Sequence, residues 1–142
     1  MSVVPVNYWA VLACGVVSMV LGSLWYGPLF GKMWMGLMGL TDEHMKSAKQ
    51  KGMGKSYALM FIGSLLMAYV LSHSLTFAGA YLNAAGVSAG LMVGFWSWLG
   101  FIAPVTLGVV LWEGKPWKLW FLNNSYSLVQ LLVFGVILAL WQ

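Results

Sequence analysis

The stretch VNYWAVLACGVVSMVLGSLWYGP, residues 6–28, decides the fold class of this chain. Its apolar part, residues 6–26, contains no Asp, Glu, Lys or Arg. A bilayer core of about 30 Å needs roughly 20 apolar residues in a helical span, so this run is long enough to cross a membrane. Gly27 and Pro28 then end the run, and the first charge of the chain, Lys32, follows. The sequence therefore predicts a transmembrane helix over residues 6–26.

Three further apolar runs follow, over residues 56–78, 87–112 and 119–141. Only 7% of the 142 residues are charged and 61% are hydrophobic, whereas a soluble domain carries about a quarter charged residues. The runs do not alternate as the strands of a β-barrel would. We therefore expect an all-α polytopic membrane protein, a single domain over residues 1–142 with four transmembrane helices in two hairpins.

The lysines predict how the chain lies in the membrane. All of them lie in or beside two connections, between the first and second runs or between the third and fourth: Lys32, Lys46, Lys49, Lys51, Lys55, Lys115 and Lys118. Lysine-bearing loops stay in the cytoplasm, so we expect both termini outside, in a bacterial inner membrane. Because arginine and basic runs are absent, no nucleic-acid partner is expected.

The longer lysine-bearing connection, residues 28–54, divides into two parts. Its first part is apolar and rich in Gly and Trp, which favours a segment lying in the membrane interface. Thr41 can then cap a short helix that Gly52 ends. The charges of that helix match its dipole, acidic in the first turn and basic in the last: Asp42, Glu43, Lys49 and Lys51.

One pattern occurs twice in the chain. Leu-Trp-x-Gly-(x)-Pro closes the first and third runs, and Ser-Tyr-small-Leu follows in each case, around Tyr57 and Tyr126. We call the two closing segments the cytoplasmic corners, with the marker residues Trp25, Gly27, Pro28, Trp112, Gly114 and Pro116. The pattern indicates either a duplicated hairpin, as in many transporters, or convergence, because Trp, Gly and Lys are common where helices meet the interface.

The third run carries a stripe of small residues. Glycines at every fourth position allow another backbone to approach closely, and in lipid such packing drives helix association. Pro104 is expected to bend the run in mid-membrane. The stripe predicts a helix–helix contact within the chain or between subunits, and with it a homo-oligomer, preferably a dimer: Gly86, Gly90, Gly94, Pro104 and Gly108.

Four polar side chains are expected near mid-membrane, where polar groups must be paired: Ser18, Ser64, Ser97 and Gln130. They indicate either interhelical hydrogen bonds or a polar pocket for a ligand. The candidate ligand-binding residues are Asn123, Ser127, Gln130, Trp98 and Ser97.

Residues for catalysis and for metal binding are lacking. No Asp, Glu or Lys lies deep in a run, which argues against proton-coupled export. His44 and His73 are expected about a membrane thickness apart, and the single cysteine, Cys14, excludes an internal disulfide. No serine or cysteine nucleophile has a histidine within plausible reach. We expect no enzyme activity, no cofactor and no metal.

The chain is similar to the bacterial and fungal membrane family catalogued as domain of unknown function 1761. Three groups of residues carry the resemblance: Val6-Asn7-Tyr8 with Gly22-x-x-Trp25-Tyr26-x-Pro28-x-Phe30-Gly31-Lys32-x-Trp34, then Trp98-Leu99-Gly100-Phe101 with Pro104, then Glu113-Gly114-Lys115-Pro116-Trp117-Lys118 with Asn123. The resemblance implies a small polytopic membrane protein and brings no activity with it.

Two functions fit these observations. The first is a non-enzymatic protein that binds or transports a small neutral or hydrophobic compound. The alternative is a structural or accessory membrane subunit with no ligand. A cavity that reaches Gln130 would favour the first function, whereas a bundle in which Gln130 bonds to neighbouring helices would speak against transport.

Overall fold

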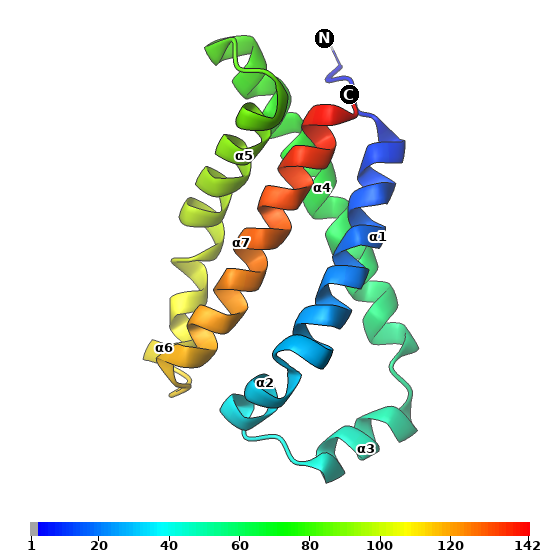
Figure 1. Ribbon diagram of the computed structural model, residues 1–142, viewed down its shortest axis with the longest axis vertical. Helices are drawn as coiled ribbons and strands as arrows, with labels where there is room; N and C mark the ends of the chain where they lie inside the picture. The colour runs from blue at the N-terminus through cyan, green and yellow to red at the C-terminus, as the bar shows by residue number, and fades with distance from the viewer. Residues whose placement is uncertain (1–2) are drawn as a thin grey trace.

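A computed structural model describes residues 3–142 of the chain (Figure 1). These residues form helices, turns and loops without any strand, so the all-α prediction is confirmed for this part of the chain. The α-helices are α1 (Tyr8–Leu24), α2 (Gly31–Met38), α3 (Asp42–Lys51), α4 (Gly54–Leu82), α5 (Gly86–Ser97), α6 (Gly108–Leu111) and α7 (Trp117–Leu140).

Three helical stretches are long and apolar enough to cross a bilayer: Tyr8–Leu29, Gly54–Leu82 and Trp117–Leu140. The third predicted run consists instead of two helical pieces, Gly86–Ile102 and Val105–Leu111, which meet at 41°. Pro104 lies at the break, as the sequence predicts, because its ring disrupts the preceding turn and it has no N–H to donate. The hydroxyl of Thr106 donates to the carbonyl of Ile102 and satisfies one of the groups at the break.

Helix α7 lies at the centre of the bundle and contacts α1, α4 and α5. In Figure 1, α5, α7 and α1 lie side by side while α4 crosses behind them. The start of α1, the end of α7 and the α4–α5 connection lie together at the top, which we call the terminal end. Helices α2, α3 and α6 lie at the bottom, which we call the lysine end because the lysine-bearing connections are there.

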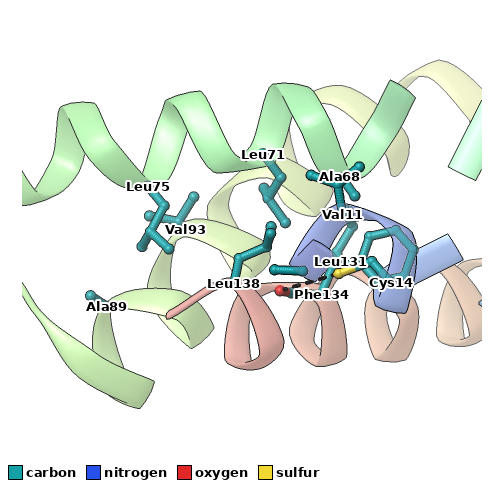
Figure 2. Packing of buried hydrophobic residues seen from close by; sticks show 11 residues of the cluster. Val11, Cys14, Ala68, Leu71, Leu75, Ala89, Val93, Leu131, Phe134 and Leu138 are labelled. Carbon is teal, nitrogen blue, oxygen red and sulfur yellow. Dashed lines mark hydrogen bonds between the residues drawn. The ribbon is translucent and has the colours of Figure 1, made fainter. Parts of the chain in front are cut away.

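The core forms where α1, α4 and α7 meet. Cys14, Ala68 and Phe134, one from each helix, are fully buried, and the Cys14 thiol lies 4.0 Å from the Phe134 carbonyl oxygen (Figure 2). Two of these three side chains are small, so the helix backbones come close together. Close packing of this kind supplies the attraction between helices that lipid cannot supply through the hydrophobic effect.

The glycine stripe of the third run makes its contact within the chain. A Cβ atom on Gly90 would overlap the Gly135 carbonyl group, and one on Gly94 would lie 2.5 Å from the Leu131 carbonyl oxygen. Both contacts join α5 to α7, so neither glycine is available to a second subunit. The other two predicted glycines do not pack against another helix: Gly86 begins α5 at a φ of +73°, and Gly108 faces only Trp112 of its own segment.

The two corner segments, around Gly27 and Gly114, have different backbones. At the first, the chain forms a π-helical turn over Trp25–Leu29 that departs from helical angles at Gly27. At the second, Gly114 has a φ of +70°, a conformation that favours glycine. The tyrosines of the two Ser-Tyr-small-Leu motifs also differ in position, because Tyr57 lies in the first turn of α4 and Tyr126 lies well inside α7. The structure therefore does not confirm the duplicated hairpin.

The short helix of the long connection is present as α3. The Thr41 hydroxyl accepts a hydrogen bond from the backbone N–H of His44, and Gly52 follows the last residue of the helix. The His44 ring also bonds back to the backbone N–H of Thr41, which completes a capping box. His44 is thus part of the helix start.

Candidate functional site

A cleft of about 400 Å³ lies between α1 and α4, and Tyr126 of α7 also lines it. In Figure 1 these two helices diverge toward the lysine end, and the cleft lies in that half of the bundle. Three tyrosines from three different helical segments line it, so we call it the tyrosine cleft. Its lining residues are all uncharged: Ser18, Met19, Gly22, Ser23, Tyr26, Gly27, Tyr57, Met60, Ser64 and Tyr126.

A chain of hydrogen bonds crosses the bundle at the inner end of the cleft. Gln130 Nε2 donates to Ser18 Oγ at 2.6 Å, and Ser18 Oγ lies 3.0 Å from Ser64 Oγ. Ser64 donates its only hydroxyl proton to the Met60 carbonyl at 2.9 Å, so Ser18 must be the donor in the serine pair. We call Ser18, Ser64 and Gln130 the polar layer. All three are buried, and the layer joins α7, α1 and α4.

The tyrosines of the cleft differ in how their hydroxyls are used. The Tyr126 hydroxyl donates to the Ser18 carbonyl at 3.3 Å, and Gly22 leaves the space that it occupies. The Tyr26 hydroxyl donates to Asn123 Oδ1 at 2.7 Å and so ties the first corner to α7. Within residues 3–142 the Tyr57 hydroxyl makes no hydrogen bond, and its side chain is 54% exposed. Tyr57 can therefore offer a donor to a ligand.

The chemistry of the cleft favours a neutral ligand. Its walls are apolar where Met19 and Met60 contribute, and its polar groups are hydroxyls. Within the described part of the chain, no group of three or more His, Cys, Asp or Glu residues could hold a metal ion. Small-molecule sites in proteins commonly combine a mostly apolar lining with a few convergent polar groups, and this cleft has that composition.

The five candidate ligand-binding residues from the sequence do not come together in this cleft. Gln130 lies behind Ser18 in the polar layer, and Asn123 binds Tyr26. Ser127 donates to the Asn123 carbonyl of its own helix. Trp98 Nε1 donates to the Asn124 carbonyl at 3.0 Å, and Ser97, directly before it, is the last residue of α5.

The surroundings of Gln130 speak against a transport pathway at this residue, because it is bonded to a neighbouring helix. Its side chain is 5% exposed and bonds to Ser18 of a neighbouring helix. It does not line the tyrosine cleft, whose floor is formed by Ser18 and Ser64. Of the two explanations open for the mid-membrane polar residues, interhelical hydrogen bonds describe this part of the bundle.

A second polar cluster, centred on Asn124, was not predicted. The Asn124 side chain, 2% exposed, donates to Thr106 Oγ1 at 2.9 Å and to the Trp120 carbonyl at 3.0 Å. The Trp98 indole donates to the Asn124 carbonyl. The cluster joins α7 to the bent segment on both sides of Pro104. The sequence marks this cluster through Asn124, next to Asn123. Two adjacent residues on a helix point to different neighbours, so the pair does not reveal which residues Asn124 contacts.

The first corner packs closely onto α7, whereas the second is largely open. The Trp25 ring lies 4.8 Å from that of Phe30 and 6.0 Å from that of Tyr126, while Trp112 is 86% exposed. The Lys115 ammonium approaches the Met38 carbonyl at 3.5 Å and joins the second corner to α2. The corners thus build the lysine end, and Tyr26 and Gly27 of the first also line the tyrosine cleft.

His73 lies apart from the cleft. Its ring contacts the Tyr69 carbonyl at 2.9 Å within α4 and packs between the rings of Tyr69 and Phe77. These contacts within one helix account for its position.

The chain belongs to the family described as protein of unknown function, DUF1761, which matches residues 9–139. The match covers nearly all of the described helices and confirms the resemblance seen in the sequence motifs. No curated protein and no solved structure matches the chain.

Proposed function

We propose that this protein is an integral membrane protein that binds a small neutral amphiphilic compound in the tyrosine cleft. The observation that carries the proposal is the cleft itself, an uncharged space among apolar helices that ends on a satisfied polar layer. Tyr57 would donate a hydrogen bond to a hydroxyl or carbonyl group of the compound. Met19 and Met60 would contact its apolar part, since methionine adapts to irregular surfaces.

The proposal includes four membrane spans, with the bent pair around Pro104 as one of them. The 41° bend is compatible with a single broken span, because Asn124 pairs with the Trp98 indole before the break and with the Thr106 hydroxyl after it. The lysines lie at one end of the bundle, and we place that end in the cytoplasm. Both ends of the chain would then lie outside.

Single cysteines test this orientation in the Cys14→Ser background. Tyr81→Cys lies at the terminal end and Lys49→Cys lies in α3, and both positions are exposed. A thiol reagent that does not cross membranes, added outside intact cells, should modify the first cysteine and leave the second intact. Modification of the cysteine at 49 alone would reverse the orientation.

Photolabelling tests the binding site. The probe is a neutral medium-chain alcohol that carries a diazirine, added to the protein in lipid vesicles. Adducts should map to the cleft-lining segments of α1 and α4. Ser23→Trp should fill the cleft and remove them, whereas Leu24→Trp, a neighbour on α1 outside the cleft lining, should retain them. If both variants were labelled equally, the proposed binding of a ligand in the tyrosine cleft would be wrong.

The alternative function is that of a structural or accessory subunit without a ligand. It predicts that Ser23→Trp and Leu24→Trp are labelled equally. The proposal involves no catalytic step and no cofactor. A homodimer stays a prediction, and its contact surface must lie away from Gly90 and Gly94, which α7 already covers.

A further inference from the structure

A groove of about 320 Å³ lies at the lysine end, where the first corner and α2 face the start of α7. We call it the lysine groove. Its first wall is formed by Trp25, Phe30 and Met33, none of which carries a charge. The groove shares no lining residue with the tyrosine cleft. It is therefore a separate site on the same protein.

The second wall of the lysine groove, on α7, changes in polarity with depth. Its four residues have the i, i+3, i+4, i+7 spacing of one helix face: Lys118, Phe121, Leu122 and Ser125. Lys118 is the second residue of α7 and lies at the outer end of the wall. Leu122 lies one turn, or about 6 Å, further into the bundle. A phospholipid has the same order, with its charged phosphate outside and its apolar chains inside.

The charges at this end of the bundle favour a ligand with a net negative charge. All charged side chains of the chain lie there, and their formal net charge is +4. Within residues 3–142, Lys115 is the only lysine whose ammonium makes a hydrogen bond, so Lys118 can bind a ligand. Lys32 of α2 lies at the same end. The cation of a zwitterionic headgroup at Lys118 would be repelled by these further lysines, whereas an anionic headgroup would be attracted.

We propose that the lysine groove is a binding site for one anionic phospholipid of the cytoplasmic leaflet. The Lys118 ammonium donates to the phosphate, and an acyl chain lies between Phe30 and Met33 on one wall and Phe121 on the other. Basic pockets between helices on the cytoplasmic side are typical sites for such headgroups. This inference rests on the proposed membrane placement of the lysine end and does not depend on a ligand in the tyrosine cleft.

Photoactivatable lipids test this site. Two probes carry the same diazirine-bearing acyl chain, one on phosphatidylglycerol and one on phosphatidylcholine. Each is added at the same low mole fraction to phosphatidylcholine vesicles that contain the protein, and adducts are mapped by mass spectrometry. Lys118→Gln removes the charge at the groove, and Lys118→Arg keeps it. The matched control is Lys51→Gln, which removes another exposed lysine at the end of α3, outside the groove.

The phosphatidylglycerol probe should label residues 25–33 and 118–125. It should give about fivefold more adducts there than the phosphatidylcholine probe, the factor that one lysine near an anionic lipid provides. Lys118→Gln should abolish this excess, whereas Lys118→Arg and Lys51→Gln should retain it. Equal losses in Lys118→Gln and Lys51→Gln would overturn the site, because they would indicate attraction by the general charge of the lysine end.

The same experiment separates the lipid from other occupants of the groove. Excess inorganic phosphate should not compete with the probe, because it makes no contact with the apolar walls. Competition by phosphate would overturn the lipid and indicate a site for a free anion. Absence of adducts, which a second copy of the chain seated in the groove would also cause, would overturn it as well. Labelling of the tyrosine cleft by the diazirine alcohol should be unchanged in Lys118→Gln, so the two proposals fail separately.

Discussion

Gln130 on α7 donates to Ser18 on α1 across 2.6 Å, and this bond links three helices because Ser18 also binds Ser64 on α4. The chain of bonds ends on the Met60 carbonyl, so every hydroxyl proton in it has an acceptor. A satisfied chain of this kind does not require a ligand. Its evident role is to hold α1, α4 and α7 in register at the inner end of the tyrosine cleft.

Replacing Gln130 with Met should cost a modest amount of stability. Methionine has a similar length and is apolar, and Ser18 keeps its bond to Ser64. We expect the free energy of unfolding in mixed micelles to fall by about 0.6 kcal/mol, the average for such bonds in membrane proteins. The matched control is Ser127→Ala, because the Ser127 hydroxyl bonds only within its own helix. Equal effects of the two changes would contradict the linking role.

Gly90→Ala should destabilise the bundle, although alanine is normally more favourable than glycine inside a helix. Its Cβ would overlap the Gly135 carbonyl group, so α5 and α7 would have to separate. Overpacking in a well-packed interior costs about 1–3 kcal/mol, and the same unfolding measurement would detect it. Gly63→Ala is the control, since nothing lies within 4 Å of the added methyl group. There, alanine should be neutral or favourable for α4.

Local patterns in the sequence predicted much of the fold. The apolar runs, the break at Pro104, the cap at Thr41 and the shared end of the lysine-bearing connections all depend on residues near one another in the chain. The buried face of α1 follows the helical period, because Val11, Cys14 and Ser18 lie three and then four residues apart and are all buried.

The contacts between residues on different helices could not be predicted from local patterns. Apolar helices of similar length can pack in many arrangements, and the depth of Gln130 in its run does not identify Ser18 as its neighbour. The tyrosine cleft depends on the divergence of α1 and α4 toward the lysine end, which no local pattern encodes. Tyr57 and Tyr126 belong to a repeated motif in the sequence, yet their shared cavity follows only from the packing.

Asn124→Leu should loosen the bent segment and spare α1. The change removes the bonds from the Asn124 side chain to Thr106 and to the Trp120 carbonyl. Amide hydrogen exchange should therefore speed up over Val105–Leu111, with little change over Tyr8–Leu24. Ser125→Ala serves as control because Ser125 is exposed beside the cluster. Unchanged exchange over the bent segment would show that Asn124 does not hold it.

Two tyrosine variants separate stability from ligand binding in the cleft. Tyr26→Phe removes the 2.7 Å bond to Asn123 Oδ1 and should lower the free energy of unfolding by about 1 kcal/mol. It keeps the ring contacts with Trp34 and Tyr126, so photolabelling of the cleft should persist. Tyr57→Phe removes a hydroxyl that bonds to nothing within the described residues, so stability should not change.

The same Tyr57→Phe variant should weaken photolabelling by the diazirine alcohol, because the donor offered to the ligand is gone. Loss of a hydrogen bond to a neutral ligand costs about 0.5–1.5 kcal/mol, or roughly a factor of 2 to 12 in affinity. The concentration of alcohol that gives half-maximal labelling measures this change. If Tyr57→Phe binds the alcohol as wild type does while Ser23→Trp does not, the cleft recognises its ligand by shape alone, and the donor role of Tyr57 is wrong.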